Sequence, residues 1–148
     1  MEKLDSKSLM VGDWVNIYVF PNDNPRDDDL FPAIITAITT PLPNEQGEEY
    51  IECIFKSEDG GIGCAARPVN TCLPIPLTAE ILEKNGFTRF GPDYILKGNH
   101  FGLENPSTPS NYLDNYWLRV SIKAVHIEYV HELQHTLRLC GIEKEIML

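Results

Sequence analysis

The segment HELQH at residues 131–135 matches a catalytic motif in both residue type and spacing. It fits the H-E-x-x-H pattern of zinc peptidases, in which His131 and His135 lie one helical turn apart and present two imidazoles to the metal. Glu132 would then act as the general base on zinc-bound water. This motif makes a small zinc-dependent hydrolase, with zinc as its cofactor, one candidate function.

A catalytic zinc also needs a third protein ligand and one open position for water. The extended peptidase pattern would place a glycine at position 138 and a histidine at position 141, whereas this chain has Arg138 and Gly141. Other candidate ligands lie just past the expected helix or upstream of it: Glu143, Glu145, His126 and His100. None of them belongs to a motif that would bring it to the histidine pair.

Helical periodicity gives a second reason to doubt the zinc site. At about 100° per residue, one stripe about 80° wide collects Val130, Leu133, Leu137 and Cys140. His135 lies almost opposite this stripe, and His131 flanks it. We therefore predict that the helix buries its leucines and turns both histidines to solvent. A hydrolase would need that face covered by a cleft, and two small modules leave no further subdomain to form its other wall.

Other catalytic and binding motifs are weak or absent. The sequence contains no G-x-x-x-x-G-K-[ST], G-x-G-x-x-G or G-x-S-x-G pattern. Asp27, Asp28 and Asp29 could chelate calcium, but they lack the spaced ligands of an EF-hand, and a solvated acidic loop is the expected structure. A Cys–His nucleophilic pair formed only in the folded chain is left open.

The four cysteines lie at positions 53, 64, 72 and 140, and no two form a C-x-x-C pair. Cys53 and Cys64 have apolar neighbours, so we expect free, mostly buried thiols rather than disulfides or metal ligands. Residues 1–10 contain both charge signs and no apolar block, which does not resemble a targeting segment. Together these features predict a cytoplasmic protein without a membrane-spanning helix.

The net charge of −10 restricts the possible partners. Residues 1–77 hold 13 Asp/Glu against 5 Lys/Arg, a balance of −8, and residues 78–148 hold 9 against 7, a balance of −2. Neither half supplies the basic cluster that a nucleic-acid backbone requires, and acidic surfaces repel anionic membranes. The acidity predicts either a solvated surface or an interface for a basic protein partner. An acidic mimic of DNA has no dedicated signal here.

The first half of the chain has the pattern of a small β-rich module. Alternating or β-branched runs predict strands at 9–20, 31–40, 50–57 and 61–69, and polar loops separate them. Short strands with polar connections are typical of a small antiparallel barrel or curled sheet. The proline-rich segment 73–77 fits neither a helix nor a central strand, and we expect a boundary there.

The second half alternates helices and strands. Thr78 as N-cap and Gly86 as stop bracket a short helix, and residues 87–98 predict a hairpin. A polar loop should span 99–115, followed by strands at 116–129 with Trp117 as a core anchor. The final helix should begin near Tyr129 and end by Cys140, and residues 143–148 should form a short strand or fray. The loops at 21–30 and 104–113 are expected to be the most mobile parts of the chain.

Three segments carry a resemblance to known sequences: GDWV at 12–15, LPIPLTAEILEKNGF at 73–87 and IEYVHELQHTLRLCG at 127–141. In this order they resemble a group of small, functionally uncharacterised proteins of Bacteroides-type genomes and their phages or mobile elements. The resemblance implies a small N-terminal β module followed by a helix, a sheet and a C-terminal helix, and it implies no activity. GDWV also looks like the first strand of SH3-like barrels, which serve as binding modules. A plain turn and strand, with Trp14 and Val15 packing inward or against the second half, is the simpler interpretation.

The sequence therefore predicts an α+β protein with two parts. Residues 1–77 should form an SH3-like, barrel-like β module, and residues 78–148 an α+β module with a helix, three or four strands and a C-terminal helix. We expect a non-enzymatic accessory or protein-interaction protein of a phage or mobile element. The alternative is the zinc-dependent hydrolase built on His131, Glu132 and His135.

Overall fold

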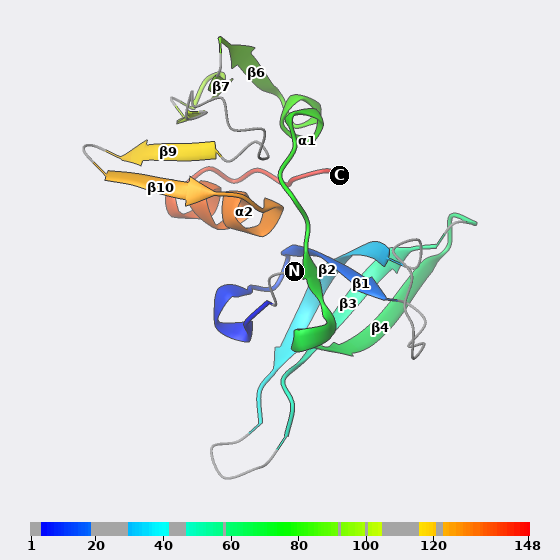
Figure 1. Cartoon of the computed structure of the whole chain (residues 1–148). Coiled ribbons are helices and arrows are strands. Elements are labelled where there is room, and N and C mark those ends of the chain that lie inside the picture. Colours follow the sequence, from blue (N-terminus) through cyan, green and yellow to red (C-terminus); the bar gives the residue numbers. More distant parts are fainter. Residues whose placement is uncertain are drawn as a thin grey trace. The chain divides into compact units, whose positions relative to one another are not determined.

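The chain divides into two compact units, Met1–Ile75 and Pro76–Leu148, and the boundary between them in the sequence falls within the proline-rich segment 73–77 (Figure 1). The computed structural model describes residues 4–18, 30–41, 47–57, 59–91, 93–99, 101–104, 116–120 and 123–148, with side chains omitted at 116–120 and 123–125. Within these residues the protein is a small mixed α+β fold with antiparallel sheets and two α-helices. The expected loops at 21–30 and 104–113 lie outside the described residues, apart from Leu30 and Glu104.

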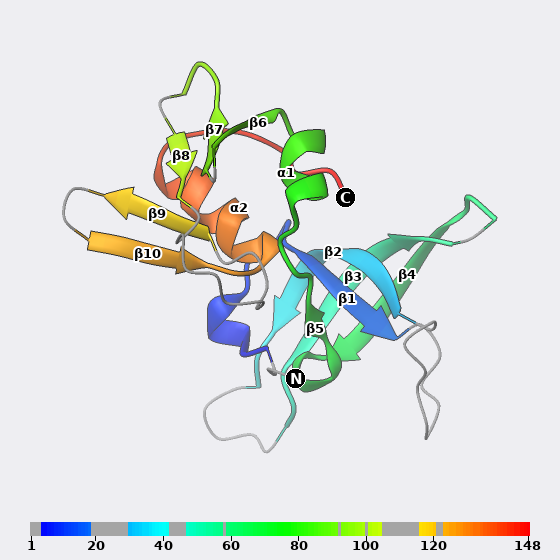
Figure 2. The same ribbon diagram turned by 45° about the horizontal axis from the view of Figure 1, so that its top comes forward.

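The first unit is a five-stranded antiparallel sheet with the strand order β4-β3-β2-β1-β5. Its strands are β1 (Trp14–Tyr18), β2 (Leu30–Thr39), β3 (Tyr50–Lys56), β4 (Ile62–Pro68) and β5 (Leu73–Pro74). Figure 2 shows β5 beside β1 at one side of this sheet. The sheet has two edges, so of the predicted barrel or curled sheet the described residues form an open sheet and no closed barrel. An edge position suits Pro74, because proline cannot donate to a strand on each side.

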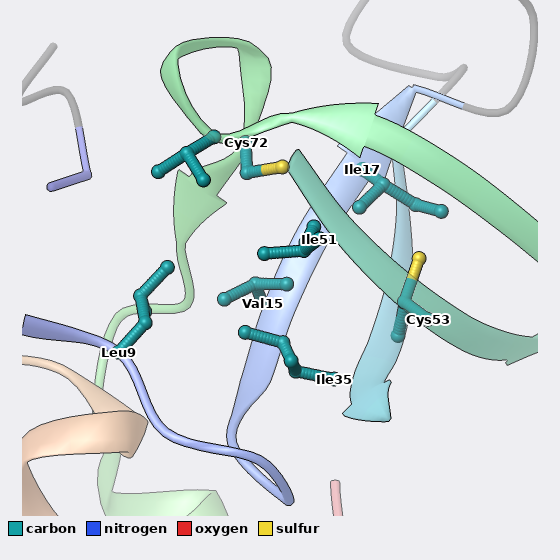
Figure 3. Close-up of a cluster of buried hydrophobic side chains, with 9 residues drawn as sticks. Leu9, Val15, Ile17, Ile35, Ile51, Cys53 and Cys72 are labelled. Atoms are coloured by element: carbon teal, nitrogen blue, oxygen red, sulfur yellow. The ribbon is translucent and has the colours of Figure 1, made fainter. Parts of the chain in front are cut away.

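One face of this sheet carries the core of the first unit (Figure 3). The pleat sends alternate residues of each strand to this face, and all of the following are buried: Val15, Ile17, Ala33, Ile35, Ile51 and Cys53. Leu9, Val69 and Cys72 join them from outside the central strands. On β1 the buried residues Val15 and Ile17 alternate with the half-buried residues Trp14, Asn16 and Tyr18.

Gly12 and Asp13 of the GDWV segment lead into β1, and Trp14 and Val15 are its first two residues. Asp13 is buried, and its Oδ2 accepts a hydrogen bond from the Met10 backbone N–H at 2.7 Å. The Gly12 N–H donates to the Ile35 carbonyl at 2.7 Å, and the Ile35 N–H donates to the Asp13 carbonyl at 3.0 Å. These bonds tie the turn to β2 and give the Gly-Asp pair a structural role.

The second unit contains two small antiparallel sheets and two helices. Its strands are β6 (Phe87–Phe90), β7 (Asp93–Leu96) and β8 (Phe101–Leu103) in one sheet, and β9 (Tyr116–Val120) and β10 (Lys123–Ile127) in the other. Its helices are α1 (Ala79–Lys84) and α2 (Val130–Leu139). The strand β8 shows that the prediction of a continuous loop over 99–115 is wrong. Its alternate residues Phe101 and Leu103 are both buried. The stretch is short and lies among Gly and Asn residues, which are typical of a loop. The side chain of the expected anchor Trp117 is outside the described part.

The helix boundaries follow the predicted capping signals. Thr78 is the N-cap of α1, and its Oγ1 accepts a hydrogen bond from the Ile81 N–H at 3.3 Å. Gly86 and Gly141 follow α1 and α2 with φ values of 79° and 70°, a conformation that glycine adopts without steric cost. Neither described helix is long and apolar enough to cross a membrane.

Candidate functional site

Glu132, the acid of the HELQH motif, stabilises the start of α2. Its Oε2 accepts hydrogen bonds from the backbone N–H groups of Glu128 at 2.7 Å and Tyr129 at 3.1 Å. Tyr129 is the N-cap and Glu132 the third helical residue, which is the acidic position of a capping box. The carboxylate thus satisfies the N–H of the N-cap, which has no helical partner, and the N–H of the residue before it. This role accounts for a glutamate at position 132 without catalysis.

The two histidines of the motif have different environments. His131 is 4% exposed, and its ring stacks on the Tyr129 ring at 5.9 Å with an interplanar angle of 9°. His135 is half-buried and meets the His131 ring edge-on, with centroids 5.9 Å apart. The prediction that both histidines face solvent is therefore wrong for His131. Gln134 is buried as well, so the first turns of α2 are covered over a wider arc than the leucine stripe alone.

The predicted apolar stripe of α2 is buried at three of its four positions. Val130, Leu133 and Leu137 are at most 1% exposed. Cys140 is exposed, because it follows the last helical residue and acts as the C-cap. The prediction of a buried stripe is therefore correct within the helix and wrong for Cys140, which lies beyond its end.

A third metal ligand does not accompany the histidine pair within the described residues. No group of three His, Cys, Asp or Glu side chains there is placed to hold a metal ion. His126 is exposed on β10, whereas His100 lies outside the described residues. Glu143 and Glu145 are exposed in the segment after α2. The zinc alternative thus has two possible ligands in place and a general base that is already hydrogen-bonded to the backbone.

A different candidate site lies on the first unit, on the sheet face opposite the core. Strand register places four residues in one row across β1 to β4: Trp14 pairs with Ile34, Ile34 with Ile54, and Ile54 with Cys64. Ile54 is 37% exposed and Ile62, one step along the same face of β4, is 77% exposed. We call these five side chains, Trp14, Ile34, Ile54, Ile62 and Cys64, the outer apolar row.

Two shallow hollows border the outer apolar row. The first has a volume of about 100 Å³ and is lined by Trp14, Ile34, Ile54, Phe55, Lys56 and Ile62. The second has a volume of about 310 Å³ and is lined by Thr36, Glu52, Cys53, Ile54, Cys64, Ala65 and Ala66. Ile54 lines both hollows. Glu52 and Lys56, two residues to either side of it on β3, are exposed on the same face. The face therefore offers an apolar hollow beside one that contains a carboxylate.

All four cysteines are free, but only two are buried. Burial raises the pKa of Cys72 to about 12, and it also raises the pKa of Cys53, against the opposing effect of the Arg67 charge. Cys64 and Cys140 are exposed, so the prediction that apolar neighbours bury Cys64 is wrong. On β4 the side chain of Cys64 points to the outer face, where its sequence neighbours do not cover it.

The sequence did contain a signal for the outer face. A strand buried on one side alternates apolar and polar residues, whereas β2 has Ile34 next to Ile35 and β3 runs Cys53-Ile54-Phe55. Adjacent apolar residues in such a strand place apolar surface on both faces. These runs located the strands, and the same adjacent apolar pairs are the signal by which the outer face could have been found.

Comparison of the chain with known protein families, with curated proteins and with solved structures finds no match. The candidate sites therefore rest on the geometry of this chain alone.

Proposed function

We propose that the protein is a non-enzymatic interaction protein whose outer sheet face binds an extended protein segment that carries both apolar and basic side chains. The observation that supports this proposal most directly is the outer apolar row, which is aligned across four strands on the face that does not carry the core. The similarity of GDWV, residues 12–15, to the first strand of SH3-like barrels agrees with a binding module. The sequence resemblance suggests an accessory role in a phage or mobile element.

The chemistry of the face argues for the type of partner. An apolar side chain of the partner would fill the hollow beside Trp14 and Ile62, since burial of apolar surface is the main favourable term in association. A Lys or Arg a few residues away would then approach Glu52 in the second hollow. The charge of −8 carried by residues 1–77 would attract basic segments from a distance and repel acidic ones.

Selection of peptides from a displayed random library on the immobilised protein tests this proposal. We expect the selected peptides to combine apolar residues with Lys or Arg. We also expect Ile54→Asp to weaken their binding at least about tenfold in calorimetric titrations, because it places a charge between the two hollows. Glu52→Lys should weaken the same peptides and make their binding less sensitive to salt.

Leu139→Asp is the matched control, because Leu139 is also an apolar residue on the surface, 87% exposed, at the end of α2 in the other unit. This variant should bind the peptides as the unmodified protein does. Circular dichroism and melting curves would show that each variant is folded. Failure to select peptides, or selected peptides that bind Ile54→Asp with unchanged affinity, would refute the proposal.

The zinc-dependent hydrolase is the competing proposal, and no observation on α2 favours it over the capping role of Glu132. The carboxylate that should activate water is held by two backbone N–H groups. A general base must reach the proton that it removes, and these two hydrogen bonds to Oε2 fix the Glu132 carboxylate at the helix cap.

A further inference from the structure

Strand β4 forms one edge of the five-stranded sheet. In the order β4-β3-β2-β1-β5, it pairs with β3 on one side, and no described strand pairs with its other side. An edge strand exposes backbone N–H and C=O groups that can pair with another strand. β5, at the opposite edge, has only two residues, whereas β4 has seven. β4 is therefore the edge of this sheet that is long enough to extend it.

Hydrogen bonds at both ends of the β3–β4 ladder show which backbone groups of β4 point outward. The Ser57 N–H donates to the Gly61 carbonyl, and the Val69 N–H donates to the Glu49 carbonyl, each at 2.9 Å. The register between these ends has no shift. Hydrogen-bonded and non-hydrogen-bonded pairs alternate along such a ladder. The N–H and C=O groups of the intervening residues, Ile62, Cys64 and Ala66, are therefore directed away from β3.

We propose that a second copy of this chain pairs with β4 in antiparallel orientation, about a two-fold axis at Cys64. In this register Cys64 lies opposite Cys64 of the second copy, and each donates to and accepts from the other. Ile62 lies opposite Ala66 of the second copy, and the same pair recurs on the other side of the axis. The contact is isologous, so it closes as a dimer.

The side chains of β4 fit this pairing. Ile62 is 77% exposed, and in the dimer it faces Ala66, whose single methyl group leaves room for it. Residues 62–66 carry no charge, whereas exposed edges are commonly protected by lysine or proline. Arg67 and Pro68 follow at the end of the paired stretch. The Arg67 Nη1 donates to the Ala66 carbonyl at 2.8 Å, and a carbonyl oxygen has a second lone pair for the bond from the second copy.

The same symmetry aligns the neighbouring strands favourably. Glu52 is the β3 partner of Ala66, and Lys56 is the β3 partner of Ile62. Each Ala66–Ile62 row of the dimer therefore leads from Glu52 of one copy to Lys56 of the other, three strand spacings away, so the pairing brings no like charges together. The two outer apolar rows meet end to end at the Cys64 pair. This inference uses the strand edge rather than the sheet face, so it does not depend on the proposed peptide binding.

Sedimentation equilibrium of the full chain over a range of concentrations tests the dimer. We expect the average mass to rise from 16.8 kDa toward twice that value as the concentration increases. Cys64→Pro removes an outward N–H without removing a bond to β3, and it should weaken association at least about tenfold. Ile62→Lys places a charge on the edge and should weaken it similarly. Val11→Lys is the matched control, because Val11 is 58% exposed and lies outside the sheet.

Cross-linking supplies a second measurement that does not depend on the proline variant folding. Opposed Cβ atoms in an antiparallel pair lie about 4.5–5.5 Å apart, within reach of a short bis-maleimide. We expect a cross-linked dimer from the unmodified protein and from Cys140→Ser, and none from Cys64→Ser. A monomer at every concentration would overturn the proposal. So would a dimer that survives both edge variants or is cross-linked through Cys140.

Discussion

The side-chain amide of Asn85 binds the backbone of Met147 in both directions. Asn85 Nδ2 donates to the Met147 carbonyl at 2.7 Å, and the Met147 N–H donates to Asn85 Oδ1 at 2.8 Å. The same Nδ2 donates to the Ile81 carbonyl at 2.8 Å, near the end of α1. Asn85 therefore joins α1 to residues 62 positions later in the sequence, and the adjacent Ile146 is 1% exposed.

Replacing Asn85 by aspartate should destabilise the second unit. Asn85 is 2% exposed, so its amide group has little water to replace a lost partner. The carboxylate keeps the acceptor for the Met147 N–H but loses the donor, and it faces two carbonyl oxygens. We expect the free energy of unfolding to fall by about 1–3 kcal/mol in urea titrations. Asn99→Asp, at an exposed turn, is the control and should stay within about 0.5 kcal/mol of the unmodified protein.

Truncations along α2 should separate its buried stripe from its exposed side. Leu133→Ala should lower the free energy of unfolding by about 2–5 kcal/mol, because Leu133 has no exposed surface. His135→Ala should cost at most about 1 kcal/mol, because His135 is only half-buried and loses mainly its edge-on contact with the His131 ring. The loss of unfolding free energy for His131→Ala should lie between these two values, since that ring is buried against Tyr129. Equal losses at positions 133 and 135 in chemical denaturation would mean that the buried face of α2 is misassigned.

Metal analysis distinguishes the helix cap from the zinc site. If Glu132 acts as a cap, Glu132→Ala should cost about 0.5–2 kcal/mol whether or not a chelator is present. The purified, untagged protein should contain substoichiometric zinc, and chelator should leave its melting temperature unchanged. A metal bound only to the native state would instead add stability that chelator removes. One zinc per chain, lost on substitution of His131 or His135, would favour the hydrolase.

The sequence predicted the elements whose signals are local. The ends of α1 and α2 followed from Thr78, Gly86 and Gly141, and the strands of the first unit followed from runs of β-branched residues. It did not predict β8 or the docking of residues 142–148, where Ile142 and Ile146 are buried without regular secondary structure. These features depend on contacts between distant residues such as Asn85 and Met147. A local pattern carries no information about such contacts.

The two candidate sites differ in the same way, because one rests on a local sequence pattern and the other on contacts between distant strands. H-E-x-x-H is a local pattern, and its spacing fits a capped helix as well as a metal site. Only the hydrogen bonds from Glu128 and Tyr129 show that Glu132 caps α2. The outer apolar row needs the strand order and register, because Trp14, Ile34, Ile54 and Cys64 come from four separate strands. From the sequence, these runs were used only to locate the strands, and the alignment of their outer residues depends on the fold.

Thiol labelling should divide the cysteines into two classes. At low protein concentration, Cys64 and Cys140 should react rapidly with a chromogenic disulfide reagent, because both are exposed. Cys53 and Cys72 should react only after unfolding, since both are buried and burial disfavours the reactive thiolate. Peptide mapping of the labelled protein would assign the sites. Rapid native labelling of Cys72, or fewer than four thiols after unfolding without reductant, would contradict the structure.

The buried thiols should make the first unit less stable in alkali. Burial raises the pKa of Cys72 from 9.0 to about 12, so between these values the unfolded chain releases a proton that the folded chain retains. The unfolded state then binds fewer protons, and the free energy of unfolding falls as the pH rises above about 9. The slope approaches at most about 1.4 kcal/mol per pH unit for this thiol, and Cys53 adds a smaller effect of the same sign.

Urea titrations of the unmodified protein and of Cys72→Ala isolate the contribution, because all other titrating groups are common to both. We expect the stability difference between the two proteins to be constant below about pH 9 and to shrink above it. A difference that stays constant through that range would show that Cys72 ionises as readily in the folded chain as in the unfolded one.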